Sequence, residues 1–411
     1  MKIVKKQSIA IIGGGASGIF ASLRCAEVAK AEKINVDIHV FEGSSKLLKK
    51  VRISGGGRCN VTHHIFEIND FCLNYPRGRK ELLSPFQNFQ ASDTVDWFEK
   101  RGVELKYESD GRMFPVTDNS ETIIDCFMQE ANNHGIKLLN KMNVKSLKKL
   151  GNGKISLFIN EDESFIADSV LIATGSMPGG YRLAQNLGHS TTEIAPSLFT
   201  FNMPKEPITA LMGIAVEEVQ VKIIGTKIRT QGPLLITHWG MSGPAILKAS
   251  SFGARALSDK EYQFEAQVNW LNESNTELLF EKLQAFIEIN PQKKVINHKS
   301  FPLPQRLWKH LVVTCDIPVS RSWKELGKKK SRQLITLLTQ HKFKVAGKTT
   351  FKEEFVTCGG VSLADVDLNT LKSKVVPNLY FAGEVIDIDA ITGGYNFQAA
   401  WSTGFIAGKL A

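Results

Sequence analysis

The pattern of apolar and polar residues near the start of the chain predicts a strand, a helix and a second strand. Apolar, β-branched residues fill 8–13, which is typical of a short buried strand. Residues 16–31 place Ile19 and Leu23 on one helical stripe, and a second strand is expected over 35–42. A strand, a helix and a strand in so short a stretch form a βαβ unit.

The pattern then changes to short strands and later to helices. Alternating apolar residues over 137–174 predict a small meander that ends in a buried strand. After Pro196 the spacing favours barrel or sandwich strands, whereas 275–289 and the residues onward through Leu334 favour helices. Strand-like residues over 343–361 are expected to return the chain to the first domain.

The C-terminal stretch from Asn378 to Leu410 again predicts a strand, a glycine loop and a helix. A β-rich block and then a helical block therefore lie between two α/β pieces. This order indicates an insertion, at about 196–348, into a discontinuous nucleotide-binding domain.

A glycine motif occupies the turn after the first strand. Gly13, Gly15 and Gly18 have the spacing GxGxxG, in which the glycines allow a tight turn, close approach of a pyrophosphate and close helix–strand packing. The helix N-terminus offers N–H groups and a partial positive charge to phosphates. Glu42 ends the second strand, where its carboxylate would accept hydrogen bonds from ribose hydroxyls. These parts together indicate a dinucleotide site.

A second contact near the C-terminus favours FAD over NAD. A flavoprotein of this type needs a site for the ribityl chain and the isoalloxazine ring, and Glu384 could accept a hydrogen bond from a ribityl hydroxyl. The turn 391–396 would aim a helix N-terminus at the same place, where it would stabilise negative charge on a reduced flavin. An ordinary strand–helix connection is the alternative explanation.

Four long motifs resemble those of one bacterial flavoprotein family. They are SGGGRCNVTH at 54–63, GPLLITHWGMSGPAIL at 232–247, TCGGVSL at 357–363 and a C-terminal motif at 380–408. With the first glycine loop they span nearly the whole chain. The chain is thus similar to the NAD(P)/FAD-dependent oxidoreductases that include aminoacetone oxidase and BaiN-like enzymes. His63 stands where that family more often has asparagine, which leaves the glycine turn intact.

The resemblance implies an α/β fold in three parts: a discontinuous Rossmann-type FAD-binding domain, an inserted β-barrel and a small helical subdomain. The expected boundaries are 1–195 and 349–411 for the FAD-binding domain, 196–270 and 336–348 for the barrel-like domain, and 271–335 for the helical insert.

The resemblance also implies which residues hold FAD. Val144 would bond the adenine through its backbone, and the turn from Arg58 to Asn60 would contact the cofactor. No metal site is expected. The full set of predicted cofactor-binding residues is Gly13, Gly15, Ala16, Gly18, Glu42, Arg58, Cys59, Asn60, Val144, Thr174, Gly175, Gly383, Glu384, Gly394 and Asn396.

Three side chains are candidates for roles in the chemistry. Arg58 would supply a positive charge for phosphate or reduced flavin, in a loop whose glycines let the backbone pass close to the cofactor. Cys59 is a candidate redox thiol, but it lacks a partner cysteine, and a packing role is favoured. His238 is the candidate for proton transfer, and a structural hydrogen bond at a strand end is the alternative.

Charge leaves the nature of the partner open. The chain has 51 Lys and Arg against 41 Asp and Glu, a net charge of +10, and basic residues gather in 320–333. This excess favours anionic partners such as nucleotides, nucleic acid or anionic lipid, whereas a solvated helix face is the simpler explanation. No stacking aromatic series accompanies the lysines, so a nucleic-acid partner is the less favoured hypothesis.

Cysteine usage and hydropathy favour a cytoplasmic protein. The six cysteines are scattered without a CxxC pair, which argues against a zinc site and a dithiol redox centre. Reduced thiols in a cytosolic protein are the simplest account. The glycines after the first strand do not fit a secretory signal, and no apolar run is long enough to predict a membrane span.

The leading functional hypothesis is an FAD-dependent oxidoreductase that transfers a hydride between a small organic substrate and flavin. The chain has no second complete GxGxxG motif, so NAD(P)H would dock transiently or oxygen would be the acceptor. The alternatives are an FAD-containing protein that binds or modifies RNA, and a sensor that uses FAD structurally. Anaerobic bleaching of the flavin by candidate reductants separates an enzyme from a sensor.

Overall fold

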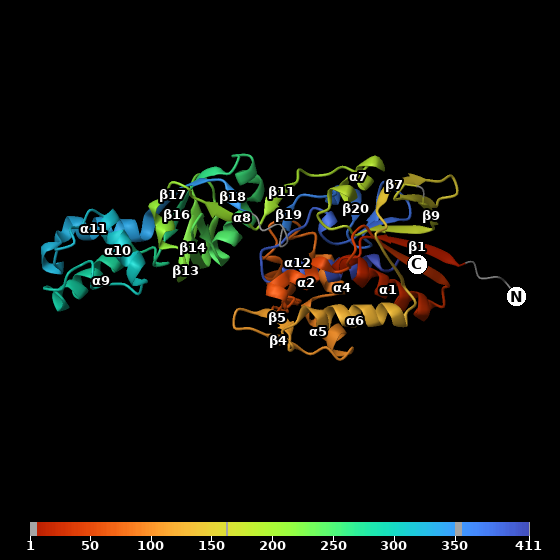
Figure 1. Ribbon diagram of the computed structural model, residues 1–411, viewed down its shortest axis with the longest axis horizontal. Coiled ribbons are helices and arrows are strands. Elements are labelled where there is room, and N and C mark those ends of the chain that lie inside the picture. Colours follow the sequence, from red (N-terminus) through yellow and green to blue (C-terminus); the bar gives the residue numbers. More distant parts are fainter. Residues whose placement is uncertain (1–5, 162, 350–355, 411) are drawn as a thin grey trace. The chain divides into compact units, whose positions relative to one another are not determined.

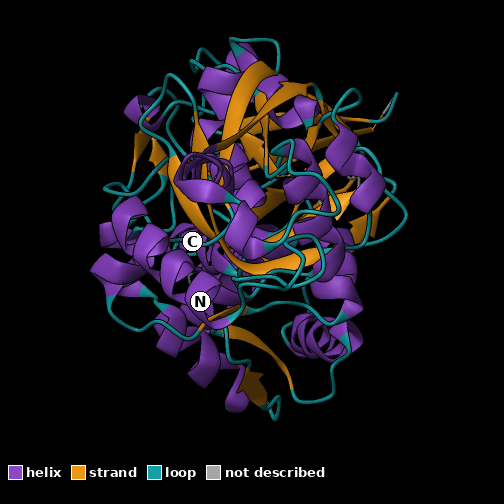
Figure 2. Cartoon of the chain, turned by 90° about the vertical axis from the view of Figure 1, so that its left-hand side faces the viewer, coloured by secondary structure: helices purple, strands orange, loops and turns teal. Residues whose placement is uncertain are grey.

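The computed structural model describes residues 6–161, 163–349 and 356–410. The chain divides into two compact units, of which unit 1 comprises 1–195 and 352–411 and unit 2 comprises 196–351. Each unit has its own hydrophobic core. Figure 2 shows that the chain contains both helices and strands. Unit 1 is therefore assembled from both ends of the chain.

Unit 1 is built on a seven-stranded sheet in the order β20-β21-β22-β10-β1-β2-β6, whose strands from β22 to β6 run parallel. A helix connects the adjacent strands β1 and β2. This is the arrangement of a Rossmann-type domain, so the predicted α/β class is confirmed. The strands are β1 (Gln7–Ile12), β2 (Val36–Glu42), β6 (Lys137–Asn140), β10 (Ser169–Ile172), β20 (Val366–Asp367), β21 (Lys372–Ser373) and β22 (Leu379–Phe381).

Smaller elements complete unit 1. The sheet β3-β5-β4 lies outside the main sheet, and β7, β8 and β9 form the predicted meander. The short strands are β3 (Thr62–His63), β4 (Leu105–Tyr107), β5 (Arg112–Pro115), β7 (Val144–Lys149), β8 (Ile155–Ile159), β9 (Glu163–Ala167) and β19 (Val356–Cys358), and β11 (Ala195–Ser197) spans the boundary between the two units. The helices are α1 (Ala16–Glu32), α2 (Lys49–Gly57), α3 (Ile68–Cys72), α4 (Leu83–Asn88), α5 (Ala91–Glu99), α6 (Ser120–Asn133), α7 (Pro178–Asn186), η3 (Leu363–Asp365), η4 (Gly383–Val385) and α12 (Tyr395–Ala407).

The C-terminal helix α12 packs against the N-terminal helix α1. Gly404 permits the approach, because a Cβ at that position would lie 2.8 Å from the backbone oxygen of Ser17. Trp401 is fully buried, its ring centroid lies 5.6 Å from that of Phe20, and its Nε1 donates to the carbonyl of Val61 at 2.9 Å. These contacts hold the two ends of the chain in one core.

Unit 2 contains a second seven-stranded sheet in the antiparallel order β17-β16-β13-β14-β15-β12-β18. The pairings of the described residues leave β17 and β18 at its edges, so closure into a barrel stays a prediction. The strands are β12 (Thr200–Asn202), β13 (Ala215–Ile223), β14 (Arg229–Thr237), β15 (Gly240–Ser242), β16 (Gln263–Asn269), β17 (His341–Ala346) and β18 (Lys348–Thr349).

The helices α9, α10 and α11 gather at one end of unit 2 in Figure 1, beside β16 and β17. Helix α9 begins where Asn275 accepts a hydrogen bond from the backbone N–H of Leu278, as expected of an N-cap. The remaining elements of unit 2 are η1 (Pro207–Leu211), α8 (Pro244–Ser258), α9 (Thr276–Ile289), α10 (Gln305–Thr314), η2 (Trp323–Glu325) and α11 (Gly327–Gln340).

Most of the expected elements are present with shifted ends. Part of the strand-like segment 343–361 falls on residues 350–355, which lie outside the described residues. Among the described helices, none combines the length and apolar composition that a membrane crossing requires.

Candidate functional site

The three glycines of the first loop have different surroundings. Gly13 has φ +112°, and a Cβ there would lie 2.4 Å from the carbonyl oxygen of Ala173. A Cβ on Gly18 would lie 2.0 Å from the carbonyl oxygen of Gly13. A Cβ on Gly15 would meet no atom within 4 Å. Gly13 and Gly18 are thus required by the packing of the chain itself, whereas Gly15 borders open space.

The N-terminus of α1 is available to an anion. Gly15 is its N-cap, Ala16 is its first residue, and neither a side-chain cap nor an acidic residue occupies the first turn. The first N–H groups of a helix lack partners within the helix, and the helix dipole places partial positive charge there. The open space at Gly15 and this helix end together fit a pyrophosphate.

Glu42 lies at the end of β2 and is held by backbone N–H groups. Its Oε2 accepts from Gly14 N at 2.9 Å and its Oε1 from Ser44 N at 2.8 Å. A carboxylate oriented this way still has free lone pairs for ribose hydroxyls. Its orientation is therefore set before any ligand binds.

An open depression of about 500 Å³ adjoins this end of the sheet. Val144 begins β7 between two residues of its lining, and its side chain is buried. The lining residues are Gly43, Lys141, Asn143, Lys145, Asn160, Glu161 and Glu163. A depression next to Glu42 and the start of β7 suits the adenosine end of a dinucleotide.

Glu384 lies in η4, which directly follows β22 at the same edge of the sheet. Its Oε1 accepts from the backbone N–H of Thr357 at 2.9 Å. Its Oε2 accepts from Lys50 Nζ at 2.6 Å, and Lys50 also donates to Ser176 Oγ at 3.0 Å. Lys50 is about half exposed, with a relative side-chain exposure of 47%. Sequence reasoning missed this lysine, because nothing in the sequence pairs residue 50 with residue 384.

Gly175 and Gly383 complete the surroundings of Glu384. Gly175 has φ +58°, and a Cβ there would lie 3.6 Å from Glu384 Oε2. Gly383 packs on α1, because a Cβ there would lie 2.5 Å from Ser17 Oγ, and its N–H donates to Thr403 Oγ1 at 2.9 Å. The predicted residues from β10, β22 and α1 therefore meet at one place.

Three buried hydroxyl groups around Glu384 have no hydrogen-bond partner among the described residues. They are Thr174 Oγ1, Tyr181 OH and Thr357 Oγ1. Burial raises the pKa of Tyr181, and the negative charges of Glu384 and Asp387 raise it further. Unpaired buried hydroxyls are costly, so their clustering indicates that a polar ligand completes this site. Tyr181 and Thr357 were not predicted, since single hydroxyl residues carry no sequence signal.

The second glycine loop, 54–57, interrupts α2. Ser54 leaves the helical conformation with ψ 148°, and Gly55, Gly56 and Gly57 all have positive φ, at 59°, 70° and 86°. A Cβ on Gly56 or Gly57 would meet no atom within 4 Å, whereas one on Gly55 would lie 2.8 Å from the ring of Phe114. The backbone at Gly56 and Gly57 is therefore exposed to open space, as expected where a ligand passes.

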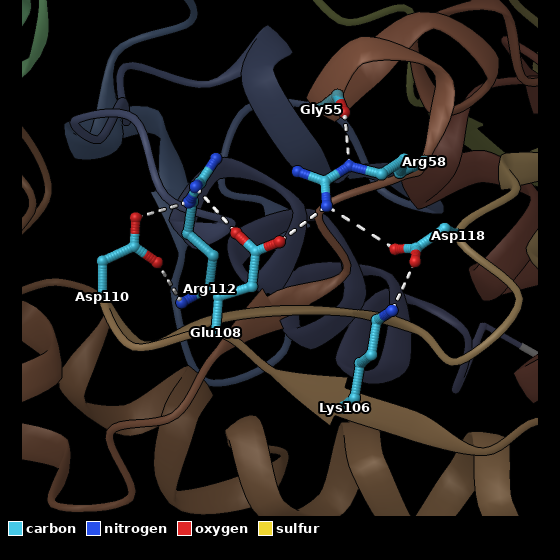
Figure 3. Close-up of polar contacts among 7 residues, drawn as sticks. All are labelled: Gly55, Arg58, Lys106, Glu108, Asp110, Arg112 and Asp118. Atoms are coloured by element: carbon cyan, nitrogen blue, oxygen red, sulfur yellow. Dashed lines mark hydrogen bonds and ion pairs between the residues drawn. The ribbon is translucent and has the colours of Figure 1, made fainter.

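The guanidinium of Arg58 is engaged by protein groups (Figure 3). Its Nη1 lies 2.6 Å from Glu108 Oε1 and 3.5 Å from Asp118 Oδ1, and its Nε donates to the carbonyl of Gly55 at 3.3 Å. It also stacks 3.9 Å above the ring of Phe114. Its predicted role as a charge toward the cofactor stays a prediction, because two carboxylates already neutralise this cation.

The same network continues along β4 and β5. Arg112 donates to the other oxygen of Glu108 at 2.8 Å and to Asp110 at 2.7 Å, and Lys106 pairs with Asp118 (Figure 3). The pKa of Asp118 lies below its ordinary value, because Lys106 donates a hydrogen bond to it and Arg58 adds positive charge. This network fixes the loop that carries Arg58 to the sheet β3-β5-β4.

Cys59 is fully buried and has the left-handed φ of 64°. Burial raises the pKa of its thiol to about 12. The thiol therefore stays protonated at physiological pH and is a poor nucleophile. This environment favours the packing role over the redox role.

Asn60 and His63 connect the second glycine loop to the turn 391–396. With its amide oriented so that Nδ2 donates to the carbonyl of Thr62, Asn60 Oδ1 accepts from the N–H of Gly394 at 2.9 Å. His63 Nδ1 lies 2.9 Å from the carbonyl of Gly393, and its ring stacks on Tyr395 at 4.6 Å. Burial lowers the pKa of His63, so this ring is neutral at physiological pH.

The turn before α12 is shaped by Asn396. Its Oδ1 accepts from Ala390 N at 3.0 Å, and its Nδ2 donates to the carbonyl of Ala390 at 3.1 Å. Gly394 is the N-cap of α12 with φ 92°, and no side chain caps this helix. The Asn396 side chain thus holds the turn, and the open N-terminus of α12 is what the turn presents.

His238 lies in unit 2, at the turn between β14 and β15. Its side chain is exposed, and its ring lies edge-on to Trp239 at 4.2 Å. No hydrogen bond of its ring is seen among the residues that the structure describes, and the structural hydrogen bond considered for it stays untested. Its role in proton transfer stays a prediction.

The residues present in unit 1 fit FAD. The open space at Gly15, the depression beside Glu42 and the unpaired hydroxyls around Glu384 match the polar groups of a dinucleotide in order along the sheet edge. When bound, FAD would be held by these residues and would supply redox chemistry that no side chain of the chain can provide.

Comparison with known proteins places this site in a family. Residues 7–410 match the family described as HI0933-like protein Rossmann domain. The chain is 30% identical over 406 residues to the ribosomal RNA dihydrouridine synthase of Escherichia coli, covering 96% of this chain and 95% of that protein. It is 26% identical over 414 residues to the 3-dehydro-bile acid delta(4,6)-reductase of Clostridium scindens, covering 98% of each.

A solved structure shares the fold. The 3-ketosteroid-delta4-(5alpha)-dehydrogenase of Rhodococcus jostii RHA1 matches with a TM-score of 0.51 at 14% identity, covering 100% of this chain and 97% of that one. At this identity the likeness concerns the fold and leaves the substrate open.

Proposed function

Because the chain belongs to the HI0933-like Rossmann family and is an FAD-dependent oxidoreductase, we propose that it reduces a carbon–carbon double bond conjugated to a carbonyl group. One observation carries this proposal. Two relatives that align over nearly the whole chain are named for such a reduction, one on a 3-keto bile acid and one on uridine in ribosomal RNA. In both substrates the carbonyl makes the distal carbon of the double bond electrophilic.

When bound, FAD would supply hydride chemistry for that carbon, with NAD(P)H as the source of the two electrons and a proton required at the neighbouring carbon. The protein's part is to bind and orient. The N-terminus of α1 would hold the pyrophosphate and Glu42 the ribose, and the unpaired hydroxyls around Glu384 would face the ribityl chain. The open N-terminus of α12 would favour negative charge on the reduced ring.

Cys59 has no electron-transfer role in this proposal. Its thiol is buried and protonated, and none of the six cysteines, all of which the structure describes, is in a disulfide. The redox centre is therefore the flavin alone. The exposed His238 is retained as the candidate for proton transfer.

A uracil base in RNA is the second candidate substrate, and charge favours it over a steroid-like enone. The chain carries a net charge of +10, and a neutral or monoanionic small molecule has no need of such an excess. Phosphates of RNA are attracted by clustered lysines and arginines. The uracil C5=C6 bond is conjugated to a carbonyl, so the same hydride chemistry would apply.

The proposal is tested by following the flavin. The purified protein is reduced under anaerobic conditions, and the substrates are mixed in separately: a 3-keto-delta4 steroid, and an unmodified ribosomal RNA transcript. Return of the oxidised flavin spectrum with formation of the saturated product is expected for one of them. A flavin that stays reduced with both substrates and is oxidised only by oxygen would contradict the proposed reduction.

A further inference from the structure

Positive charge is concentrated in one short stretch of unit 2. Residues 291–332 contain 11 Lys and Arg against 2 Asp and Glu, a net charge of +9, while the whole chain carries +10. Residues 271–290, which include α9, contain 1 Lys against 4 Glu. The excess therefore belongs to a particular surface and is not spread over the chain.

Backbone pairing brings the basic residues of this stretch together. Segments 291–298 and 318–326, which we call the basic ribbon, run antiparallel through the bridge between Lys294 and Ser322. The N–H of Trp323 donates to the carbonyl of Lys293 at 3.0 Å. Four exposed basic residues thus lie side by side: Lys293, Lys294, Arg321 and Lys324.

Two buried tryptophans fix the basic ribbon to the core. Trp308 Nε1 donates to the carbonyl of Val295 at 2.8 Å, and Trp323 Nε1 donates to the carbonyl of His298 at 3.0 Å. Both indole rings are fully buried. The cations therefore stand on a fixed backbone, which lowers the entropy cost of binding a partner.

Most cations of the stretch are not neutralised by the protein. Seven exposed side chains make neither an ion pair nor a hydrogen bond with any described residue. They are Lys293, Lys294, Lys309, Arg321, Lys324, Lys328 and Lys329.

Two of the acidic groups nearby, Glu277 and Glu325, are already engaged. Glu277 pairs with Arg332 at 2.6 Å. Glu325 accepts from Ser322 Oγ at 2.6 Å and from Ser322 N at 2.9 Å. A surface that leaves this many cations unpaired attracts a polyanion.

We propose that the basic ribbon, together with the start of α11, binds the phosphate backbone of RNA. An anionic membrane is the less favoured partner, because an interfacial helix needs a free apolar face. Most apolar positions of α10 and α11 are buried in the core, as Leu307, Leu311, Leu334 and Leu338 show, and the exposed Val313 of α10 does not make an apolar face by itself. This inference rests on RNA as the proposed substrate, and it adds where the RNA is held.

The test measures binding without turnover. A fluorescein-labelled RNA hairpin is titrated by anisotropy against the full chain over a range of salt concentrations. The variant replaces Lys293, Lys294, Arg321 and Lys324 by Gln. The matched control replaces four exposed lysines of unit 1, Lys30, Lys80, Lys100 and Lys409, by Gln and removes the same charge. Flavin content of each protein verifies the fold of unit 1, and circular dichroism verifies that of the whole chain.

The ribbon variant should bind the hairpin at least tenfold more weakly than the wild type. Its plot of log Kd against log salt should be shallower by about 3, since each released counterion contributes about 0.7 to the slope. The control variant should differ from the wild type by less than threefold.

Equal losses of RNA affinity in the ribbon variant and the control variant would overturn the proposal. Unchanged RNA affinity of the ribbon variant would also overturn it. Binding to phosphatidylglycerol vesicles without binding to RNA would also overturn it. Because the assay needs no reaction, RNA binding without reduction of the RNA would count against RNA as the substrate and leave this inference standing.

Discussion

The two glycine loops of unit 1 use glycine for different physical reasons. In the first loop, Gly13 and Gly18 are surrounded by backbone atoms that a Cβ would strike, and Gly15 alone borders open space. In the second loop, Gly56 and Gly57 border open space and are demanded by their left-handed φ. The first loop is a packed turn with one position that borders open space, whereas the second is a bent backbone that borders open space at Gly56 and Gly57.

Glycine motifs can therefore join three separate requirements: close packing, space for a ligand and a left-handed φ. Substitution of a packing glycine should impair folding, and substitution of a ligand-facing glycine should impair cofactor binding. Substitution of a glycine with a left-handed φ should impair both modestly. Each requirement can be broken by itself.

Gly18→Val is expected to have the largest effect. Its Cβ would lie 2.0 Å from a backbone oxygen that cannot move without displacing β1, so we expect destabilisation of about 3 kcal/mol or more. Thermal unfolding and expression level measure the effect. A stable, flavin-loaded Gly18→Val protein would show that the helix–strand contact is not as close as described.

Gly15→Val is expected to leave the protein folded but free of flavin. Its backbone has the extended φ of −89°, which valine accepts, and loss of the N-cap glycine costs about 1 kcal/mol. The new methyl groups would occupy the pyrophosphate space, so FAD occupancy should fall at least tenfold. Flavin absorbance per protein measures it.

The control for this variant is Gly151→Val, which also borders open space but lies in the turn between β7 and β8. It should retain full flavin. Full occupancy in the Gly15 variant would mean that the loop is not the phosphate cradle.

Gly56→Ala is expected to have a smaller effect on both properties. Its φ of 70° costs alanine about 1 kcal/mol, and no atom obstructs the new methyl group. Gly102→Ala carries the same kind of strain, at φ 78° in open space away from the loop. Both variants should lose similar stability, and only Gly56→Ala should also bind FAD more weakly. Equal FAD affinity in the Gly56→Ala and Gly102→Ala variants would show that the second glycine loop does not contact the cofactor.

Cys59→Ser is expected to have the smallest effect. Because burial raises the thiol pKa to about 12, the thiol is protonated throughout the physiological range and can be replaced without loss of a reactive group. Flavin reduction rate should stay within about twofold of the wild type. If the rate of flavin reduction fell by orders of magnitude while the flavin content stayed intact, the hypothesis that Cys59 is a redox thiol would be supported.

The parts that sequence reasoning predicted are those with local signals. The glycine spacing and the position of Glu42 identify the first loop, because a tight turn and a strand end need those residue types in that order. Asn275 similarly identifies the start of α9. Such features depend on neighbours in the chain and are readable from it.

The parts that sequence reasoning missed depend on contacts between distant segments. Lys50, Tyr181 and Thr357 converge on Glu384 only because the fold brings α2, α7 and β19 to the same place. Arg58 was expected to face the cofactor as a free cation, and no local pattern reveals that Glu108 pairs with it. The hydrogen-bond and ion-pair partners of these polar groups lie far away in the sequence, so only the folded structure reveals them.

The most direct test of the central claim, that both ends of the chain build one FAD site, is the identity of the released cofactor. The purified protein should be yellow, and denaturation should release FAD, because Glu42 and the depression beside it are placed for an adenosine. Release of FMN would contradict the account, and so would a colourless protein that FAD cannot reconstitute.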